Sequence, residues 1–135
     1  MKATARRKGG FTHRIAIRHH ELTVDEPTDH GGSDQGPSPQ ELLAGSIASC
    51  TAITLEMYAD RKGWDLGELE VECEYETPQP GSPATFKIVL RLPADCTQEQ
   101  IDRLHVVAGK CPVHRMLEGG SVFEERIELV APERA

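Results

Sequence analysis

The chain has 135 residues, is 38% hydrophobic and 27% charged, and so has the size and composition of one globular domain; we expect residues 1–135 to form a single domain. Its formal net charge of −7 argues against nucleic acid and anionic membranes as partners, because both are bound through basic patches. The sequence predicts neither a transmembrane helix nor a signal peptide, since the basic N-terminus is not followed by an apolar segment, and we expect a cytoplasmic protein.

Four stretches alternate between apolar and polar residues with a period of two, which is typical of half-buried antiparallel strands. The second and third stretches flank a turn at 78–83 that is rich in Pro and Gly, and they are predicted to form a hairpin. The segment 27–38 is also rich in Gly and Pro and is predicted to be a loop. The apolar faces carry, in chain order, Phe11, His13, Ile15 and Ile17; Leu69, Val71, Cys73 and Tyr75; Phe86, Ile88, Leu90 and Leu92; and Phe123, Ile127 and Leu129.

Residues 39–62 are predicted to form the longest helix. Ser38 is a suitable N-cap residue, Pro39 suits the first helical position, and Gly63 is a typical C-terminal stop. Residues 42–55 carry no charge, whereas a surface helix would show a polar stripe, so this helix should be enclosed on most sides. One small domain offers little cover of that kind, and we infer partly from this that the chain forms a homodimer.

A second helix is predicted from the N-cap Thr97 to about Gly109, because T-Q-E-Q resembles a capping box. A short third helix should follow Cys111, with Pro112 at its first position. The order of strands, loop, long helix, hairpin, two helices and a final strand predicts an α+β fold with antiparallel sheet.

The four cysteines do not suggest a disulfide framework, because a chain of this length does not need such staples and no secretion signal is predicted. Cys73 lies mid-strand on an apolar face, where a small core thiol is the usual role. Cys96 lies at a strand-to-helix turn, and no neighbour in the sequence would activate it.

Cys50 and Cys111 are the candidate reactive pair. Cys50 lies midway along the predicted long helix and is either a core thiol or, if an arginine is brought to it from elsewhere, a reactive one, because burial alone raises the pKa of a thiol. Cys111 precedes a helix start, where backbone N–H groups favour a thiolate, and His114 and Arg115 follow within one turn. Cysteine is a poor N-cap residue, which favours a functional role for Cys111 over a purely geometric one.

A metal site is a further alternative. Cys111 and His114 have ligand-like spacing, and Cys50 could be a third ligand, but zinc sites usually contain paired ligand knuckles and none occurs here. We therefore expect no metal and no other cofactor. The polar residues between Asp25 and His30 could also be taken for ligands, and we interpret them as a solvated loop.

Two segments carry the most specific motifs in the chain. They are residues 25–64, D-E-P-T-D-H-G-G-S-D-Q-G-P-S-P-Q-E-L-L-A-G-S-I-A-S-C-T-A-I-T-L-E-M-Y-A-D-R-K-G-W, and residues 111–119, C-P-V-H-R-M-L-E-G. Together they resemble the OsmC/Ohr family, and the likeness is closest to its OsmC-like branch related to YhfA. The intervening pattern agrees, so the resemblance covers nearly the whole chain.

The resemblance implies an intertwined homodimer in which two long central helices are wrapped by antiparallel sheets from both chains. It also implies a thiol peroxidase centre, in which Cys50 attacks the peroxide and becomes a sulfenic acid and Cys111 condenses with it to a disulfide. Organic hydroperoxides would be the substrates, and a dithiol, in the better-known branches a lipoylated protein, would be the reductant. The surroundings of Cys50, including Ile47, Ile53 and Thr54, would suit such a substrate.

The sequence departs from the family's peroxidase motif at one position. That motif has a glutamate ten residues before the first cysteine, which holds an arginine over the thiolate. Here the position is Gln40, and the carboxylate follows at Glu41, about 100° further around the helix. The candidates for the arginine are Arg14 and Arg18, with Arg7 as a third, all in the N-terminal strands.

Two functions follow from these observations. The leading hypothesis is a thiol peroxidase for organic hydroperoxides. The alternative is a non-catalytic OsmC-like dimer that binds a small ligand or senses redox state; Gln40 favours it, and the paired cysteines oppose it.

Overall fold

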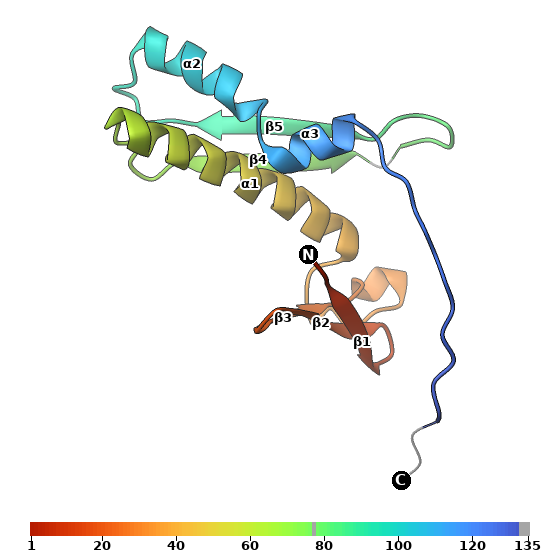
Figure 1. Cartoon of the computed structure of the whole chain (residues 1–135). Helices are drawn as coiled ribbons and strands as arrows, with labels where there is room; N and C mark the ends of the chain where they lie inside the picture. The colour runs from red at the N-terminus through yellow and green to blue at the C-terminus, as the bar shows by residue number, and fades with distance from the viewer. Residues whose placement is uncertain (77, 133–135) are drawn as a thin grey trace.

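The computed structural model describes residues 1–76 and 78–132 and has an α+β architecture with two separate antiparallel sheets (Figure 1). The α+β class predicted from the sequence is confirmed. In chain order the elements are β1 (Thr4–Gly9), β2 (Thr12–Ile17), β3 (His20–Val24), the 3-10 helix η1 (Thr28–His30), α1 (Pro39–Lys62), β4 (Glu70–Glu76), β5 (Thr85–Arg91), α2 (Gln98–Ala108) and α3 (Pro112–Glu118).

The long helix α1 begins and ends where its flanking residues predict. The Ser38 hydroxyl accepts a hydrogen bond from the Glu41 N–H at 3.2 Å, and the Glu41 carboxylate accepts one from the Ser38 N–H at 2.9 Å, which completes a capping box. Gly63 closes the helix in a left-handed conformation, with φ of 71°. The side chains that α1 buries are Ile47, Thr51, Leu55 and Ala59.

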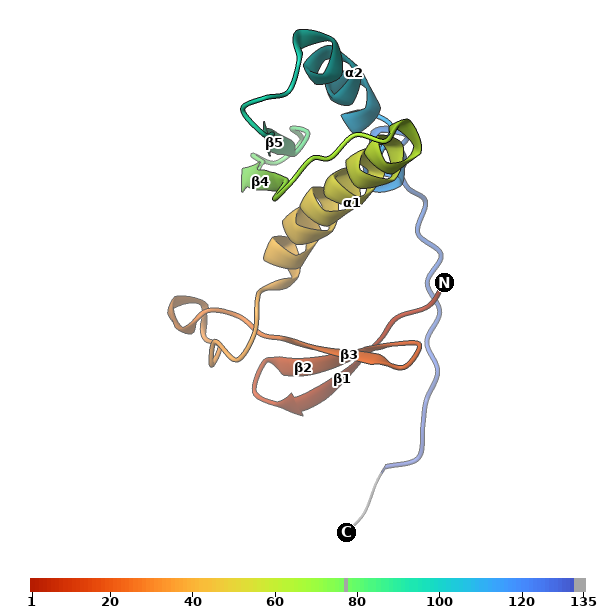
Figure 2. The same cartoon turned by 90° about the vertical axis from the view of Figure 1, so that its left-hand side faces the viewer.

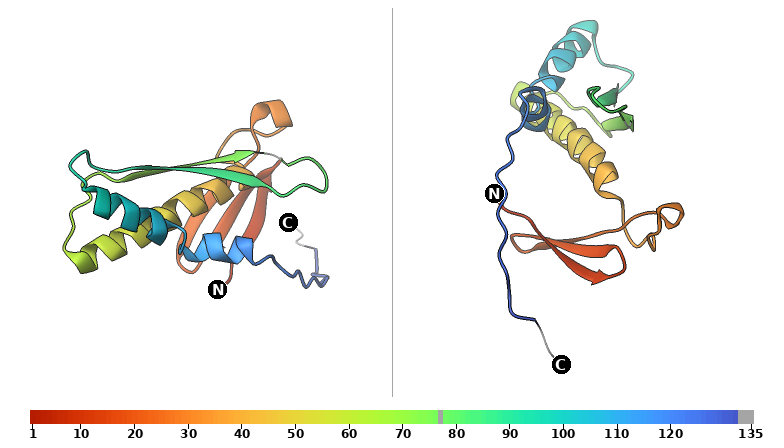
Figure 3. Two further views of the ribbon diagram at one scale, coloured as in Figure 1. Left: turned by 90° about the horizontal axis from the view of Figure 1, so that it is seen from above. Right: turned by 90° about the vertical axis from the view of Figure 1, so that its right-hand side faces the viewer.

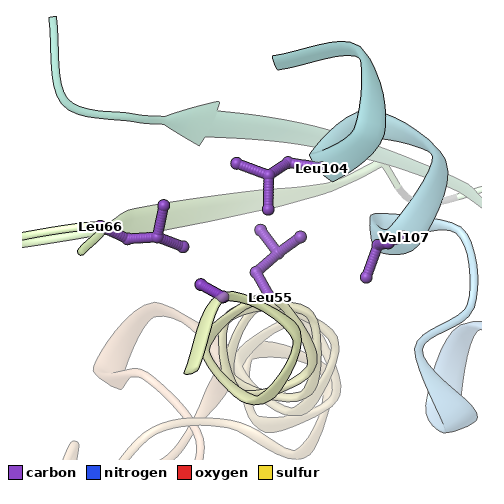
Figure 4. Close-up of a cluster of buried hydrophobic side chains, with 5 residues drawn as sticks. Leu55, Leu66, Leu104 and Val107 are labelled. Atoms are coloured by element: carbon purple, nitrogen blue, oxygen red, sulfur yellow. The ribbon is translucent and has the colours of Figure 1, made fainter. Parts of the chain in front are cut away.

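The core lies between α1, α2 and the β4–β5 hairpin (Figure 4). Leu55 of α1 and Leu104 of α2 are both fully buried and point toward one another. Val71 and Leu90, from the helix-facing side of the hairpin, pack against this cluster. Helix α2 starts from a capping box at Thr97, as the T-Q-E-Q motif predicts, and α3 follows Cys111.

The three-stranded N-terminal sheet lies at the N-terminal end of α1, apart from the hairpin and α2 (Figures 2 and 3). The connection between β3 and α1 is ordered around Asp25, which is only 1% exposed. Its carboxylate accepts hydrogen bonds from the Thr12 hydroxyl and from the N–H groups of Glu26, Ser33 and Gln35. The interpretation of this segment as a solvated loop is therefore wrong for Asp25.

The sequence predicts only β2 in the N-terminal sheet. The pattern of alternation misses β1 because all six of its residues are exposed, and it misses β3 because only Val24 is buried. Both strands are held by backbone pairing to β2 rather than by an apolar face of their own.

The strand predicted around Phe123, Ile127 and Leu129 is wrong for the single chain. Residues 120–132 form an extended segment without secondary structure (Figure 1), in which these three side chains are 83%, 91% and 94% exposed. A strand needs a neighbouring edge to satisfy its backbone, and within the described residues this segment pairs with neither sheet.

Helix α1 is covered on one side only, which differs from the expected enclosure. Ile53 and Met57 on the other side are 54% and 63% exposed. By length and composition alone α1 could cross a bilayer, whereas the sequence analysis predicts no transmembrane helix. In the structure α1 packs against β4, α2 and α3, as the central helix of a folded domain does.

Candidate active site

Cys50 and Cys111 come together where α1 meets α3. Cys50 lies midway along α1 and is half-buried, whereas Cys111 lies at the N-cap of α3 and is fully buried. Each thiol acts on the pKa of the other as a hydrogen-bonding neighbour. The structure thus brings together the two sulfurs that the sequence singles out.

The environment of Cys50 favours its protonated form. Burial raises the pKa of the Cys50 thiol, and the adjacent Cys111 raises it further. The N–H of Val113 and the hydroxyl of Thr54 act in the opposite direction, but they do not cancel the effect. In the single chain Cys50 therefore keeps its proton at neutral pH.

The environment of Cys111 favours the thiolate. Burial raises the pKa of Cys111, but its polar neighbours outweigh this and leave the pKa lowered. These neighbours are the Cys50 thiol, the N–H groups of His114 and Val113, and the Thr51 hydroxyl. Because Cys111 forms no regular side-chain capping bond, the N–H groups act on its sulfur as nearby dipoles.

Accessibility and acidity are thus divided between the two sulfurs. The half-buried Cys50 is the thiol whose pKa is raised, and the fully buried Cys111 is the one whose pKa is lowered. A nucleophilic Cys50 thiolate can form by transfer of its proton to Cys111, or under the influence of a cation from outside the chain.

Gln40 and Glu41 occupy the first turn of α1 and are both exposed. The Glu41 carboxylate is engaged in the capping box, and its hydrogen bonds with the Ser38 N–H and hydroxyl lower the pKa of Glu41. Glu41 therefore holds the start of the helix. Whether either residue also holds an arginine stays a prediction.

The candidate arginines lie in or beside the N-terminal sheet. Arg14 pairs with Glu21 on the neighbouring strand at 3.7 Å, and Arg7 donates to the Gly10 carbonyl at 3.0 Å. Arg18 occupies the β2–β3 turn with φ of 53°. The groups that dominate the pKa of Cys50 include no arginine, so within one chain none of these candidates is placed over the sulfur.

The three predicted substrate-binding residues lie on different sides of α1. Thr54 is adjacent to Cys50 and its hydroxyl acts on the thiol. Ile53 is exposed on the uncovered side of the helix, and Ile47 is buried on the side that faces β5. Of the three, only Thr54 acts on the thiol pair, and the substrate role of all three stays a prediction.

The remaining cysteines stand outside the site. Burial raises the pKa of Cys73, which is paired across the hairpin with Ile88, and Cys96 packs against the core cluster. In the part of the chain that the structure describes, no group of three or more His, Cys, Asp or Glu side chains has the arrangement of a metal site.

Two residues of the site were missed by the sequence analysis. Thr51 was overlooked because it follows Cys50 directly, yet its spacing from Ile47 and Leu55 places it on the buried stripe of α1. His114 was noted only for its charge and its spacing from Cys111. Its side chain lies between α3, α1 and β5, where it lines two cavities of about 460 Å³ each.

A further cavity of about 670 Å³ lies on the face of the N-terminal sheet that adjoins the start of α1. Its lining is mostly apolar and includes Phe11, Ile15, Val24 and Leu42. Because side chains alternate along a strand, Arg14 lies on the opposite face of this sheet.

Comparison with known proteins agrees with this architecture. The family model for OsmC-like protein matches residues 31–126. The protein YmaD of Bacillus subtilis (strain 168), itself uncharacterised, is 26% identical over 106 residues, which cover 72% of this chain and 71% of YmaD.

Two crystal structures show the same fold. The OsmC-like protein of Mycoplasma pneumoniae is 18% identical to this chain and superposes with a TM-score of 0.74. The superposition covers 88% of this chain and 87% of the Mycoplasma pneumoniae chain. An organic hydroperoxide resistance protein OsmC of Legionella pneumophila is also 18% identical to this chain and superposes with a TM-score of 0.64. That superposition covers 88% of this chain and 90% of the Legionella pneumophila chain. With the family model matched over most of its length, the chain belongs to the OsmC-like protein family.

Proposed function

We propose that the protein is a cysteine-based peroxidase that reduces organic hydroperoxides. The observation that supports this most is the meeting of an accessible thiol, Cys50, with a buried sulfur whose pKa is lowered, Cys111. The name of the Legionella pneumophila relative, an organic hydroperoxide resistance protein, points to the same substrate class.

The reaction uses both sulfurs in turn. Cys50 passes its proton to Cys111, and its thiolate attacks the terminal oxygen of the hydroperoxide. The O–O bond breaks, Cys50 becomes a sulfenic acid, and the alkoxide takes a proton from solvent to leave as the alcohol. Cys111 then attacks the Cys50 sulfur, which forms the disulfide and releases water. An external dithiol, such as a lipoylated protein, restores both thiols by exchange.

The working form in this proposal is an intertwined homodimer in the cytoplasm. Three features support it: the uncovered side of α1 with Ile53 and Met57, the apolar cavity of the N-terminal sheet, and the unpaired segment 120–132. A second copy that places its helix and strands against these surfaces would bury apolar area that one chain leaves in water.

The dimer would also complete the catalytic site. In one chain Cys50 lacks the cation that would stabilise its thiolate, so the arginine would come from the partner, with Arg14 and Arg18 as candidates. Gln40 in place of the motif's glutamate could accept a hydrogen bond from this arginine but supplies no charge. Ile47, Ile53 and Thr54 would flank the organic part of the substrate.

A second candidate is a non-catalytic dimer that binds a small ligand or senses redox state. It is favoured by the exposed, uncharged Gln40 and by the engagement of the Glu41 carboxylate in the helix cap. In that case the two thiols would respond to oxidants without turnover.

Titration with cumene hydroperoxide distinguishes the two functions. One equivalent added to reduced protein should consume two thiols and produce a Cys50–Cys111 disulfide, identified by peptide mass mapping. Cys50→Ser should be inert, Cys111→Ser should retain a sulfenic acid that dimedone traps, and Cys73→Ser is the matched control that behaves as wild type. Full retention of the thiols in the wild-type protein would reject the peroxidase.

A further inference from the structure

Helix α3 and its N-cap residue carry a cysteine, a histidine and a glutamate that succeed one another along one side. Cys111, His114 and Glu118 are three and four residues apart, which is the spacing of neighbours on a helix surface. Glu118 lies toward solvent with a side chain that is 67% exposed, the His114 side chain is 33% exposed, and Cys111 is fully buried. The three residues therefore lead from the buried sulfur to water.

The contact between the last two residues fixes the histidine. The Nε2 atom of His114 lies 2.5 Å from Oε1 of Glu118, so Nε2 carries the hydrogen that the carboxylate accepts. The lone pair of the neutral imidazole is then on Nδ1. A carboxylate in this position orients the ring and stabilises the imidazolium once the ring takes a second proton.

The Nδ1 atom of His114 is sealed from solvent and has no hydrogen-bond partner among the described residues. A buried acceptor without a donor is unfavourable, and such an atom in a folded protein calls for a functional or structural explanation. The ring belongs to the α1–α3 interface, where it lines a cavity together with Thr51. Thr51 also acts on the Cys111 sulfur through its hydroxyl, as the N–H of His114 does.

We propose that His114, oriented by Glu118, is the proton acceptor for Cys111 when the disulfide forms. This inference rests on the proposed function. Cys111 has received the proton of Cys50 in the first step, and because it is fully buried, water cannot remove that proton directly. Nδ1 of His114 takes the proton, and the imidazolium is held by the Glu118 carboxylate.

The resolving step then balances. The S–H bond of Cys111 breaks, its electron pair forms the S–S bond with Cys50, and the S–O bond of the sulfenic acid breaks. The departing hydroxide takes the proton from the imidazolium and leaves as water. His114 and Glu118 return to their starting state.

This role predicts that His114 and Glu118 affect the second thiol reaction and not the first. In stopped-flow mixing with one equivalent of cumene hydroperoxide, His114→Gln should lose the Cys50 thiol at the wild-type rate. Disulfide formation should be slower by roughly 100-fold, the lower end of the range for loss of a general base. Dimedone should trap more Cys50 sulfenic acid in this variant than in wild type.

Two further variants separate a relay from a structural role. Glu118→Gln keeps a hydrogen-bond acceptor for Nε2 but removes the charge, and at a surface position it should fold normally while slowing disulfide formation several-fold. His105→Gln changes another histidine that lines the same cavity as Thr51 and His114, and it should match wild type in both steps. Equal slowing of both steps in the His114 and Glu118 variants, or wild-type disulfide formation in them, would overturn the relay.

A second oxidant keeps this test independent of the peroxidase. Diamide first forms an adduct with the Cys50 sulfur, and Cys111 then displaces the reduced diamide to form the same disulfide. His114→Gln should slow that second step as well. If the wild-type protein ignores cumene hydroperoxide, the proposed function fails, while the diamide reaction still decides whether His114 serves Cys111.

Discussion

The Thr12 hydroxyl donates a 2.7 Å hydrogen bond to the Asp25 carboxylate, which ties the start of β2 to the end of β3 and to the loop that leads into α1. The same carboxylate accepts the N–H groups of Glu26 at 2.7 Å and Gln35 at 3.2 Å. The loop also needs its glycines, because a Cβ on Gly32 would lie 1.9 Å from the Glu26 carbonyl oxygen. One buried side chain therefore sets how the N-terminal sheet joins the central helix.

Replacement of Asp25 should loosen this loop without unfolding the core. Asp25→Asn replaces the carboxylate with a neutral amide. It therefore removes the charge that the N–H groups of Glu26, Ser33 and Gln35 stabilise. Amide hydrogen exchange should accelerate across 25–38 and stay unchanged in α2. Asp29→Asn, an exposed carboxylate in η1, is the control, and equal exchange in both variants would contradict the role of Asp25.

Stability should fall in acid through the same carboxylate. The Thr12 hydrogen bond is the largest of the contacts that lower the pKa of Asp25, and those contacts together outweigh its desolvation. A carboxyl whose folded pKa is depressed contributes stability that is fully present above its unfolded value of about 3.9 and is lost as the pH falls through the folded pKa. Urea midpoints of wild type and Asp25→Asn should thus differ at pH 7, and the difference should shrink as the pH falls below the unfolded value of about 3.9. A constant difference across that range would contradict this.

Removal of Leu55 should destabilise the core strongly. Leu55 is fully buried against Leu104, so Leu55→Ala should cost about 2–5 kcal/mol, as large-to-small changes in well-packed cores do. Leu55→Met keeps the volume and should cost less than about 1.5 kcal/mol. Chemical denaturation measures the free energy of unfolding of both variants. If Leu55→Ala were destabilised less than Leu55→Met, Leu55 would not be a core residue.

Loss of Cys50 should reduce the thiolate content of Cys111. The Cys50 thiol is the largest of the contacts that lower the pKa of Cys111, while burial raises it, so in Cys50→Ala the pKa of Cys111 should rise. In an ultraviolet titration the thiolate signal of Cys111 should appear at higher pH than in wild type. Cys73→Ser should leave that signal in place, because Cys73 stands outside the pair and burial raises its own pKa. An unchanged signal in Cys50→Ala would locate the thiolate elsewhere.

A charge on the uncovered side of α1 should separate the proposed dimer. Ile53 is 54% exposed in the single chain, and Ile53→Asp would bury an unpaired carboxylate if a second copy covered it. Analytical ultracentrifugation should then show monomer where wild type sediments as dimer. Lys62→Gln, an exposed change at the end of the same helix, is the control. A wild-type protein that sediments as monomer would remove the dimer from the proposal.

The helices could be predicted from the sequence because their ends are encoded locally. Ser38 with Glu41 and Thr97 with Gln100 form reciprocal caps, and such caps depend on residues three apart. The strands are less clearly encoded, since β1 is exposed on both faces and is held by pairing to β2 alone. Phe123 and Leu129 have the pattern of a strand, but a pattern does not provide the edge to which a strand must bond.

The candidate site, like the fold, could be predicted from the sequence only in part. The pairing of Cys50 with Cys111 could be predicted from a motif on each side of the contact. The roles of Thr51 and His114 could not, because they depend on the packing of α3 against α1 and β5, which no local pattern encodes. The arginine that would act on Cys50 also lies beyond prediction from one chain, since Arg14 and Arg18 belong to a sheet that stands apart from the sulfur.

Both sheets are built from sequence neighbours: β1, β2 and β3 are joined by short turns, and β4 is followed directly by β5. Hairpins of this kind close within microseconds, whereas contacts between distant segments form slowly. Each half of the molecule should therefore acquire its secondary structure quickly and on its own. If a second copy completes the fold, the final refolding phase will be bimolecular, and its rate will rise in proportion to protein concentration.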